Sequence, residues 1–229
     1  MTEPIFLGVG VALITLFDDD LAVDVGATAA HARTLVDLGV SAVLVAGSTG
    51  EPESLTRDER SALIAGVREA LPPAVPVLAL SPPFAPDPRP YYDALAAACE
   101  VPLLAYHFPD RSSPGIPLEA LVDLPVAGLK DSSGSVDRLL STFEAWDGPI
   151  WPGSSALVCT AAALGCPGVI LALANAEPDR CVAAFAGGGD GAAQRRLTPS
   201  HQAQRGRFPH GIKALTAARF GTSTRTRMG

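Results

Sequence analysis

The chain has 229 residues, of which 48% are apolar and 18% are charged, and its formal net charge is −7. This length and composition predict one globular domain with a sizeable core and exclude a disordered chain. The negative charge gives no overall attraction to nucleic acid or to an anionic membrane. No apolar run approaches the ~18 residues that a membrane helix needs. We therefore expect a cytoplasmic protein that binds neither nucleic acid nor membranes.

The cysteines and the N-terminal run agree with that expectation. Cys99, Cys159, Cys166 and Cys181 form no C-x-x-C pair, and the last three sit among Ala, Leu and Val. They are predicted to be small buried hydrophobes in a reducing compartment, not disulfides or metal ligands. The apolar run 4–17 follows an acid and precedes three aspartates, so it predicts a strand rather than a signal peptide.

Positive charge is concentrated at the C-terminal end. From Gly191 onward there are eight Lys/Arg residues and no acid. We therefore divide the chain into a (β/α) barrel domain, residues 1–190, and a basic C-terminal helical segment or tail, residues 191–229. Such a tail could touch polyanions, but the expectation is a solvated or frayed terminus.

Short apolar runs alternate with amphipathic segments, which is typical of repeated β-α units on a parallel sheet. A capping box, Thr56-Arg-Asp-Glu59, marks the start of one helix, and Pro117 stands where the first turn of another would begin. The predicted strands are 6–17, 42–46, 75–80, 102–108, 126–130, 149–153 and 168–174. The predicted helices are 23–38, 58–70, 91–99, 118–123, 156–164 and one from a cap at Ser135 to Trp146.

This repeat, with polar residues just after the strands, predicts an α/β fold of the (β/α)8 TIM-barrel type. In that fold the chemistry lies at the carboxyl ends of the strands. A doubly wound open sheet is the structural alternative, but no G-x-G-x-x-G follows the first strand to support a dinucleotide site.

Lysine is rare in this chain. Of 17 basic residues only Lys130 and Lys213 are lysine, and Lys130 ends the apolar run 126–130. A buried ammonium is costly to desolvate, so its pKa falls and the amine becomes neutral. A neutral amine is what a Schiff-base nucleophile requires, and arginine cannot supply it. The alternative is a strand-end lysine whose head reaches into solvent.

Two other segments could serve such a lysine. An imine with a ketone lets the adjacent carbon lose a proton, and Tyr106 can supply a phenol that moves protons. The turn Gly47-Ser-Thr-Gly50 offers backbone N–H groups and two hydroxyls, which suit a small carboxylate. Taken alone, Tyr106 could equally be a core or rim tyrosine, and turns of this sequence are usually structural.

Three segments carry a more specific signal. Ala46-Gly-Ser-Thr-Gly-Glu51, Ala105-Tyr-His-Phe-Pro109 and Gly128-Leu-Lys-Asp-Ser-Ser133 resemble, in order and rough spacing, three signature segments of one family. It is the dihydrodipicolinate synthase/N-acetylneuraminate lyase family of pyruvate-dependent class I aldolases. The resemblance extends from the first strand through Asn175, and it implies a barrel enzyme that assembles as a dimer or tetramer and uses no metal or organic cofactor.

The resemblance also implies roles for individual residues. Lys130 would form the imine and Tyr106 would handle protons, with Thr49 as a further catalytic residue. Arg111 stands where the synthase branch carries an arginine for the carboxylate of the aldehyde substrate, a task that suits a bidentate guanidinium. Its alternative is a rim salt bridge. The residues expected to bind substrate are Ser48, Thr49, Arg111, Gly153 and Ile170.

The chain departs from the family pattern in three places. Between Leu78 and Tyr106 the family would need about two βα repeats, and this chain has room for one. The run Ser81-Pro-Pro-Phe84 looks like a junction across the missing repeat, and its phenylalanine replaces a proton-relaying tyrosine. His107 replaces a common asparagine. The C-terminal helices after Asn175 also look shortened.

The functional hypotheses follow from both sets of observations. The leading one is a lyase or aldolase that joins pyruvate or another 2-oxo acid to an aldehyde, as 4-hydroxy-tetrahydrodipicolinate synthase does. A close alternative is an aldolase of 2-keto-3-deoxy sugar acids. A third is a catalytically inactive remnant that only binds a 2-oxo acid, because the missing repeat could remove activity.

Overall fold

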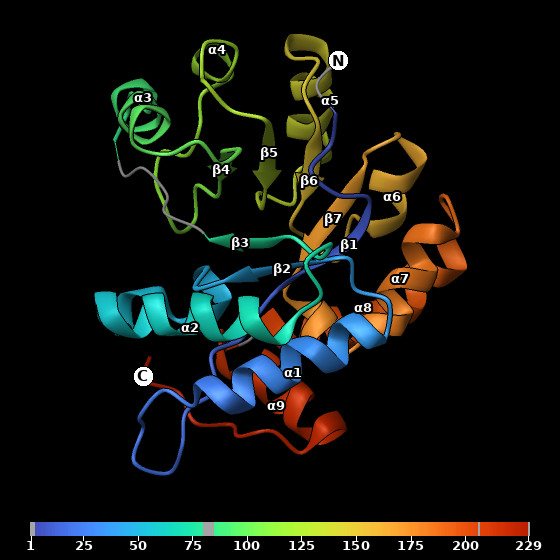
Figure 1. Ribbon diagram of the computed structural model, residues 1–229. Helices are drawn as coiled ribbons and strands as arrows, with labels where there is room; N and C mark the ends of the chain where they lie inside the picture. The colour runs from blue at the N-terminus through green and yellow to red at the C-terminus, as the bar shows by residue number, and fades with distance from the viewer. Residues whose placement is uncertain (1–2, 80–84, 206, 229) are drawn as a thin grey trace.

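A computed structural model describes residues 3–79, 85–205 and 207–228, and within them seven strands form two parallel sheets (Figure 1). The first sheet has the order β3-β2-β1-β7 and the second the order β4-β5-β6. The strands are β1 Gly8–Ala12, β2 Ala42–Val45, β3 Val77–Ala79, β4 Leu104–His107, β5 Gly128–Asp131, β6 Ile150–Pro152 and β7 Gly168–Leu171. Six of them lie within a segment predicted to be a strand, and β5 extends one residue beyond its predicted segment, to Asp131.

Three helices begin at side-chain caps that the sequence supplies. The side chain of Asp24 accepts from Ala27 N–H, Thr56 and Glu59 form the predicted capping box, and Ser135 accepts from Arg138 N–H. The helices are α1 Val25–Asp37, α2 Arg57–Ala70, α3 Arg89–Ala98, α4 Leu118–Leu121, α5 Val136–Ala145, α6 Val158–Ala163, α7 Pro178–Ala186, α8 Gly191–Arg205 and α9 His210–Phe220. In Figure 1, α1 and α2 cover the outer side of the first sheet and α3, α4 and α5 lie outside the second.

Side chains alternate along the strands, so each strand contributes to two cores. Outward residues such as Val43, Leu129 and Val169 pack against the helices in one large apolar cluster. The inward residues form a second, smaller cluster between the two sheets, comprising Phe6, Ala12, Ala42, Leu44, Trp151 and Ile170 with Leu78 and Leu104 packed against it. Since this inner cluster draws on both sheets, the two sheets enclose one interior, as the strands of a barrel do.

The sheets do not close into a hydrogen-bonded barrel within the described residues, which corrects the expectation of a TIM-barrel closure. Strands β6 and β7 lie side by side but belong to separate sheets. On the other side, β3 is the outermost strand of its sheet, and Ala79 at its end is exposed. The proposed junction Ser81–Phe84 lies outside the described residues. The packed interior therefore brings the carboxyl ends of the seven strands together although the backbone hydrogen bonds between the described strands are not continuous.

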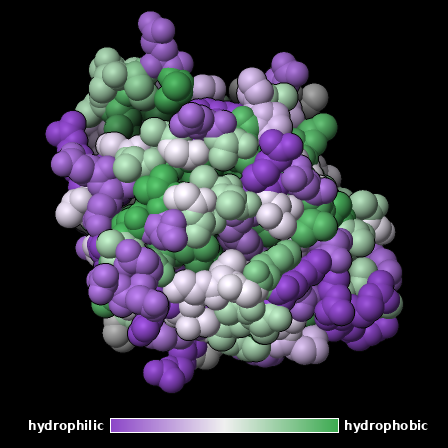
Figure 2. Space-filling view, turned by 60° about the horizontal axis from the view of Figure 1, so that its bottom comes forward, coloured by the Kyte–Doolittle hydropathy of each residue, from purple (hydrophilic) through white to green (hydrophobic). Residues whose placement is uncertain are grey.

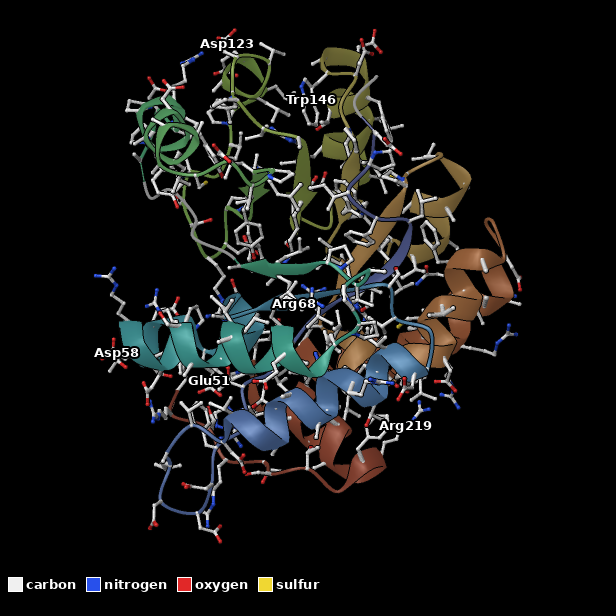
Figure 3. All side chains as sticks on the ribbon, viewed as in Figure 1. Glu51, Asp58, Arg68, Asp123, Trp146 and Arg219 are labelled. Carbon is white, nitrogen blue, oxygen red and sulfur yellow. The ribbon has the colours of Figure 1, made fainter. Side chains whose placement is uncertain are left out.

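The C-terminal segment is ordered, so the expectation of a frayed tail was wrong. Thr226 Oγ1 and the backbone N–H groups of Arg227 and Met228 donate to one carboxylate oxygen of Glu51, over 2.6, 2.8 and 2.9 Å. Glu51 lies beneath α2 in the view of Figure 3, beside this returning segment. The error has a physical cause. A segment that looks solvated in the sequence is held in place when a buried carboxylate, here that of Glu51, accepts its hydrogen bonds.

One face of the molecule has a mixed surface. On the face shown in Figure 2, hydrophilic clusters alternate with hydrophobic and intermediate residues rather than forming one continuous field. Among the helices that the structure describes, none has both the length and the apolar character needed to cross a membrane.

Candidate active site

The register of two neighbouring strands places Lys130 beside Tyr106. The two residues are direct partners in the parallel pairing of β4 with β5, so both side chains point to the same side of the sheet. The ammonium nitrogen of Lys130 lies 4.8 Å from the centre of the Tyr106 ring. Asp131, the next residue, points to the opposite face and accepts from the backbone N–H of Ser133 at 2.8 Å. Strand alternation thus keeps the nearest carboxylate away from the lysine.

The environment of Lys130 suits a neutral amine. Its side chain is 3% exposed and stands above the inner apolar cluster, and it makes no salt bridge with any residue in the described ranges. Burial lowers the pKa of Lys130 from its ordinary value of 10.5 to about 7. The expectation of a solvent-reaching lysine head is therefore wrong, because the head is enclosed between strands.

The turn after β2 reaches the same place. Ser48–Gly50 forms a short 3-10 helix, and Ser48 Oγ lies 3.1 Å from the hydroxyl of Tyr106. Burial raises the pKa of Tyr106, although hydrogen bonds to Ser48 and Ser132 act in the opposite direction. A second tyrosine, Tyr92 of α3, accepts a hydrogen bond from the backbone N–H of Tyr106 through its hydroxyl oxygen, over 3.0 Å. The phenol of Tyr106 is therefore protonated at neutral pH and fixed in orientation.

One cavity of about 430 Å³ joins these residues. It is lined by every residue singled out from the sequence: Ser48, Thr49, Tyr106, Arg111, Lys130, Gly153 and Ile170. Glycine is required at position 153, because a Cβ there would collide with the side chain of Ser132 in the neighbouring loop. The carboxyl ends of β2, β4, β5, β6 and β7 all contribute to this cavity, as expected for a parallel barrel-like arrangement.

Arg111 stands at the rim of the cavity. Its side chain is exposed, and its guanidinium lies 4.8 Å above the ring of Phe208, from the segment between α8 and α9. It forms no ion pair with the residues that the structure describes, so the rim salt bridge weighed above is not found. The planar guanidinium of Arg111 stacks on the Phe208 ring, and the residue lines the cavity at its exposed edge.

The unassigned His107 has a structural position. Its Nδ1 accepts from the backbone N–H of Ile116 at 2.9 Å, and its ring packs against Gly115, where a Cβ would collide with it. Its neighbours on β4 show that it points away from the inner cluster, opposite to Tyr106. His107 therefore fixes the loop that follows β4 rather than contributing to the cavity. Phe84, the residue that replaces the family's relay tyrosine, lies outside the described residues.

Several residues that line the cavity were missed by sequence reasoning. Ser155 comes from the loop after β6, while His201, Gln204 and Arg205 come from α8 and Phe208 follows it. Three polar residues of α8, Gln194, His201 and Gln204, are spaced seven and three apart and share one helix face. That spacing was the available signal, and it was overlooked because residues 191–229 were read as a tail.

A larger cavity of about 690 Å³ lies elsewhere, between α1 and residues 220–223. It holds His31 and three aspartates but no lysine and no tyrosine. Burial lowers the pKa of His31 to about 4, so its imidazole is neutral there. Of these two cavities the smaller one is the candidate active site, because it brings together an amine, a phenol and hydroxyl groups. In the described ranges no group of three or more His, Cys, Asp or Glu side chains is arranged to hold a metal ion.

Fold and site together define an α/β protein of parallel strands whose cavity, at the strands' carboxyl ends, contains a buried lysine beside a tyrosine. The chain belongs to the Dihydrodipicolinate synthetase family, whose model matches residues 5–81 and 82–206.

Individual relatives agree with this membership. An uncharacterized DapA-like lyase of Halobacterium salinarum is 28% identical over 255 residues, covering 93% of this chain and 84% of the relative. A 4-hydroxy-tetrahydrodipicolinate synthase of Natronomonas pharaonis is 28% identical over 80% of this chain and 75% of its own length. The crystal structure of dihydrodipicolinate synthase from Thermotoga maritima shares the fold, with a TM-score of 0.89 at 21% identity over 98% of this chain and 92% of that one.

Proposed function

We propose that this protein is a class I aldolase or lyase that forms an imine between Lys130 and pyruvate or a related 2-oxo acid. The observation that carries the proposal is the buried, carboxylate-free Lys130 amine with a pKa of about 7, placed beside the Tyr106 phenol in one cavity. Family membership supports a lyase of this type. Burial of both groups fits chemistry in which the amine is first a nucleophile and then, as a protonated imine, the electron sink.

The proposed reaction uses groups that line the cavity. The neutral Lys130 amine attacks the keto carbon, and loss of water leaves a protonated imine. Removal of a proton from the adjacent methyl carbon gives an enamine, whose carbon forms a bond to the carbonyl carbon of an aldehyde. The aldehyde oxygen takes a proton, and water then hydrolyses the imine, releasing product and restoring the amine. Tyr106 is proposed to move these protons, and Ser48 and Thr49 beside it are proposed to bind the carboxylate of the 2-oxo acid.

The aldehyde substrate separates two versions of this function. A reaction like that of 4-hydroxy-tetrahydrodipicolinate synthase requires a cation for the aldehyde's own carboxylate, and Arg111 at the cavity rim could supply it. An aldolase of 2-keto-3-deoxy sugar acids would instead bind hydroxyl groups. The serines at 132, 133, 154 and 155 that line the cavity favour that second version. Steady-state rates with an acidic aldehyde and with glyceraldehyde, each with pyruvate, distinguish the two.

An inactive form that only binds a 2-oxo acid is the competing proposal, and it rests on the proposed loss of one βα repeat. The family match is interrupted between residues 81 and 82, at the proposed junction. The alignment with the Halobacterium relative spans 255 residues, whereas 93% of 229 is about 213, so about 42 positions have no counterpart here. A gap of that size supports the loss of one repeat. The exposed end of β3, next to that junction, supports pairing with a second copy, so a dimer or tetramer is also proposed.

Borohydride trapping tests the proposed function. Pyruvate and borohydride are added to the protein, and the adduct is located by intact-protein and peptide mass. A mass increase on the peptide with Lys130, and none on the peptide with Lys213, is the expected result. Since Lys213 is the only other lysine, it serves as the internal control. A folded protein that forms no adduct with any 2-oxo acid would refute the imine mechanism, and an adduct without turnover of aldehydes would favour the inactive form.

A further inference from the structure

A hydrogen-bonded cluster on α8 forms a wall of the cavity that the imine chemistry does not use. Ser155 Oγ lies 2.8 Å from Nδ1 of His201, and the amide nitrogen of Gln204 donates to the same hydroxyl over 2.8 Å. All three side chains are more than nine-tenths buried and all line the cavity. Burying a polar group costs free energy unless the group forms hydrogen bonds, and these three bond mainly to one another. The proposed imine chemistry gives them no role, so another role is open to them.

The cluster accommodates a tautomer of His201 that suits ligand binding. The Gln204 amide donates to Ser155 Oγ, and the serine's own proton can be donated to His201 Nδ1. With Nδ1 as the acceptor, the ring proton sits on Nε2. Burial, with the nearby charge of Arg205, lowers the pKa of His201, so the ring is neutral at pH 7. His201 therefore presents one uncharged N–H donor.

That donor has no partner within the described residues. No hydrogen bond to Nε2 of His201 is found there, whereas its Nδ1 is bound, and the Oε1 atom of Gln204 is buried without a partner. The wall is also rigid, because Gln194 of the same helix donates to the carbonyl of Ser155 at 2.8 Å and accepts from Cys159 N–H at 3.1 Å. A fixed, unpaired donor on a cavity wall is suited to select a ligand oxygen.

We propose that Ser155, His201 and Gln204 form the subsite for the aldehyde substrate, with His201 Nε2–H donating to an oxygen on that substrate's chain. This inference rests on the proposed aldolase function and adds its substrate class: an aldehyde with a hydroxyl or carboxylate oxygen beyond the reacting carbonyl. Arg205 and Arg111, which line the same cavity, add positive charge on its open side. Ser155 and Gln204 are positioning residues that act through the imidazole.

The first test needs no turnover. Glycerate and succinate, which carry the required oxygens but cannot react, are titrated into the wild type and into His201→Leu by calorimetry. We expect His201→Leu to weaken binding of at least one of them by about 10-fold or more, since an unmade hydrogen bond in a buried site costs that much. His210→Leu, the same change outside the cavity, is the matched control and should bind as the wild type does. Equal binding by wild type and His201→Leu, or no binding by either, overturns the subsite.

The second test uses catalysis with two aldehydes of equal length, glyceraldehyde and propanal. In His201→Leu, kcat/KM is expected to fall by about 10- to 100-fold with glyceraldehyde and less than about 3-fold with propanal. His201→Gln keeps a donor and should recover part of the loss, and Ser155→Thr should recover more than Ser155→Ala. Trapping of pyruvate on Lys130 should be unchanged in all of them. Equal losses with both aldehydes, or loss of the pyruvate adduct in a folded variant, would refute the assignment.

The failures of the two proposals are distinguishable. If glycerate or succinate binds in a His201-dependent manner but no pyruvate adduct forms, His201 remains a ligand-binding residue, and both the aldolase function and the aldehyde as its ligand are refuted. If the adduct forms and His201→Leu alters neither binding nor selectivity, the function stands and the subsite falls.

Discussion

The two lysines of this chain occupy contrasting environments although both are buried. Lys130 is 3% exposed, has the Tyr106 ring beside it and forms no ion pair within the described residues. Lys213 is fully buried, and its ammonium lies 2.5 Å from a carboxylate oxygen of Glu51, 2.5 Å from the carbonyl of Arg225 and 4.4 Å from the centre of the Phe17 ring. Burial alone therefore does not make a lysine reactive. What distinguishes them is whether a carboxylate compensates the charge.

The paired lysine supports the site from outside it. Glu51 ends the turn that carries Ser48 and Thr49, and its backbone is in the left-handed region at a φ of 57°, which non-glycine residues seldom adopt. Burial alone would raise the pKa of Glu51, but hydrogen bonds from Lys213 and Thr226 bring it below the ordinary value. Lys213 and the C-terminal segment thus hold one end of the turn that we propose binds the 2-oxo acid's carboxylate.

The largest expected effect comes from removing the unpaired lysine. Lys130→Met and Lys130→Arg should both abolish the pyruvate adduct and reduce any aldol rate by at least roughly 10³-fold, because neither side chain can form an imine. Mass spectrometry after borohydride treatment and a coupled rate assay measure the two losses. Full activity in Lys130→Arg would contradict the mechanism, since a guanidinium retains the charge but not the nucleophile.

Breaking the buried pair is expected to affect stability most. Lys213→Met leaves the Glu51 carboxylate buried without its cation, and we expect it to lower the free energy of unfolding by roughly 3–5 kcal/mol. Urea unfolding at pH 7 measures this loss. The double variant Glu51→Gln/Lys213→Met should lose less than the sum of the two single changes, because it leaves no uncompensated charge. Additive losses would show that the two groups do not act as a pair.

The unpaired lysine should have the opposite effect on stability. The folded pKa of Lys130 is about 7 and the ordinary value is 10.5. Between these values the unfolded chain binds a proton that the folded chain does not, so the wild type gains stability as pH rises from about 7 to 10.5. Lys130→Met removes a penalty that is full below pH 7, and we expect it to be more stable there by roughly 5 kcal/mol. Unfolding curves at pH 6 and pH 10 should show that advantage shrinking; a constant or reversed difference would mean that Lys130 is not desolvated.

The sequence predicts a contact well when the two residues are close in the chain or lie on consecutive strands, and poorly when they are far apart. The Lys130–Tyr106 contact was predictable, because consecutive parallel strands put both residues at neighbouring carboxyl ends. The Thr56–Glu59 capping box was predictable for the same local reason. Nothing local indicates that Lys213 meets Glu51, 162 positions away, since that pair depends on how α9 packs.

The α8 wall of the cavity was missed for the same reason as the buried pair. A helix face made of Gln194, His201 and Gln204 shows its polar spacing in the sequence, but its partner, Ser155, is set by tertiary packing. Closure of the strands also escaped prediction, because a repeat pattern counts strands without fixing the hydrogen bonds between β6 and β7.

The smallest expected effect concerns the outer contact of the C-terminal segment. Arg227 binds both carboxylate oxygens of Glu59, at 2.8 and 3.1 Å, and donates to the carbonyls of Leu21 and Ser54. The pair is partly exposed, so Arg227→Ala should cost only about 1 kcal/mol of unfolding free energy at pH 7. Arg33→Ala, which removes an exposed helical pair with Asp37, is the control and should cost less than about 0.5 kcal/mol.

The pH dependence of that small effect distinguishes a charged contact from simple packing. Hydrogen bonds from Arg227 and Thr56 lower the pKa of Glu59 from 4.5 to about 2. The stabilisation is therefore fully present above pH 4.5 and is lost as pH falls toward 2, when the folded carboxylate also takes up its proton. The difference between wild type and Arg227→Ala should be constant from pH 5 to 8 and shrink below that range. A difference that persists at pH 2 would assign the contact to packing of the Arg227 side chain over Phe17 rather than to its charge.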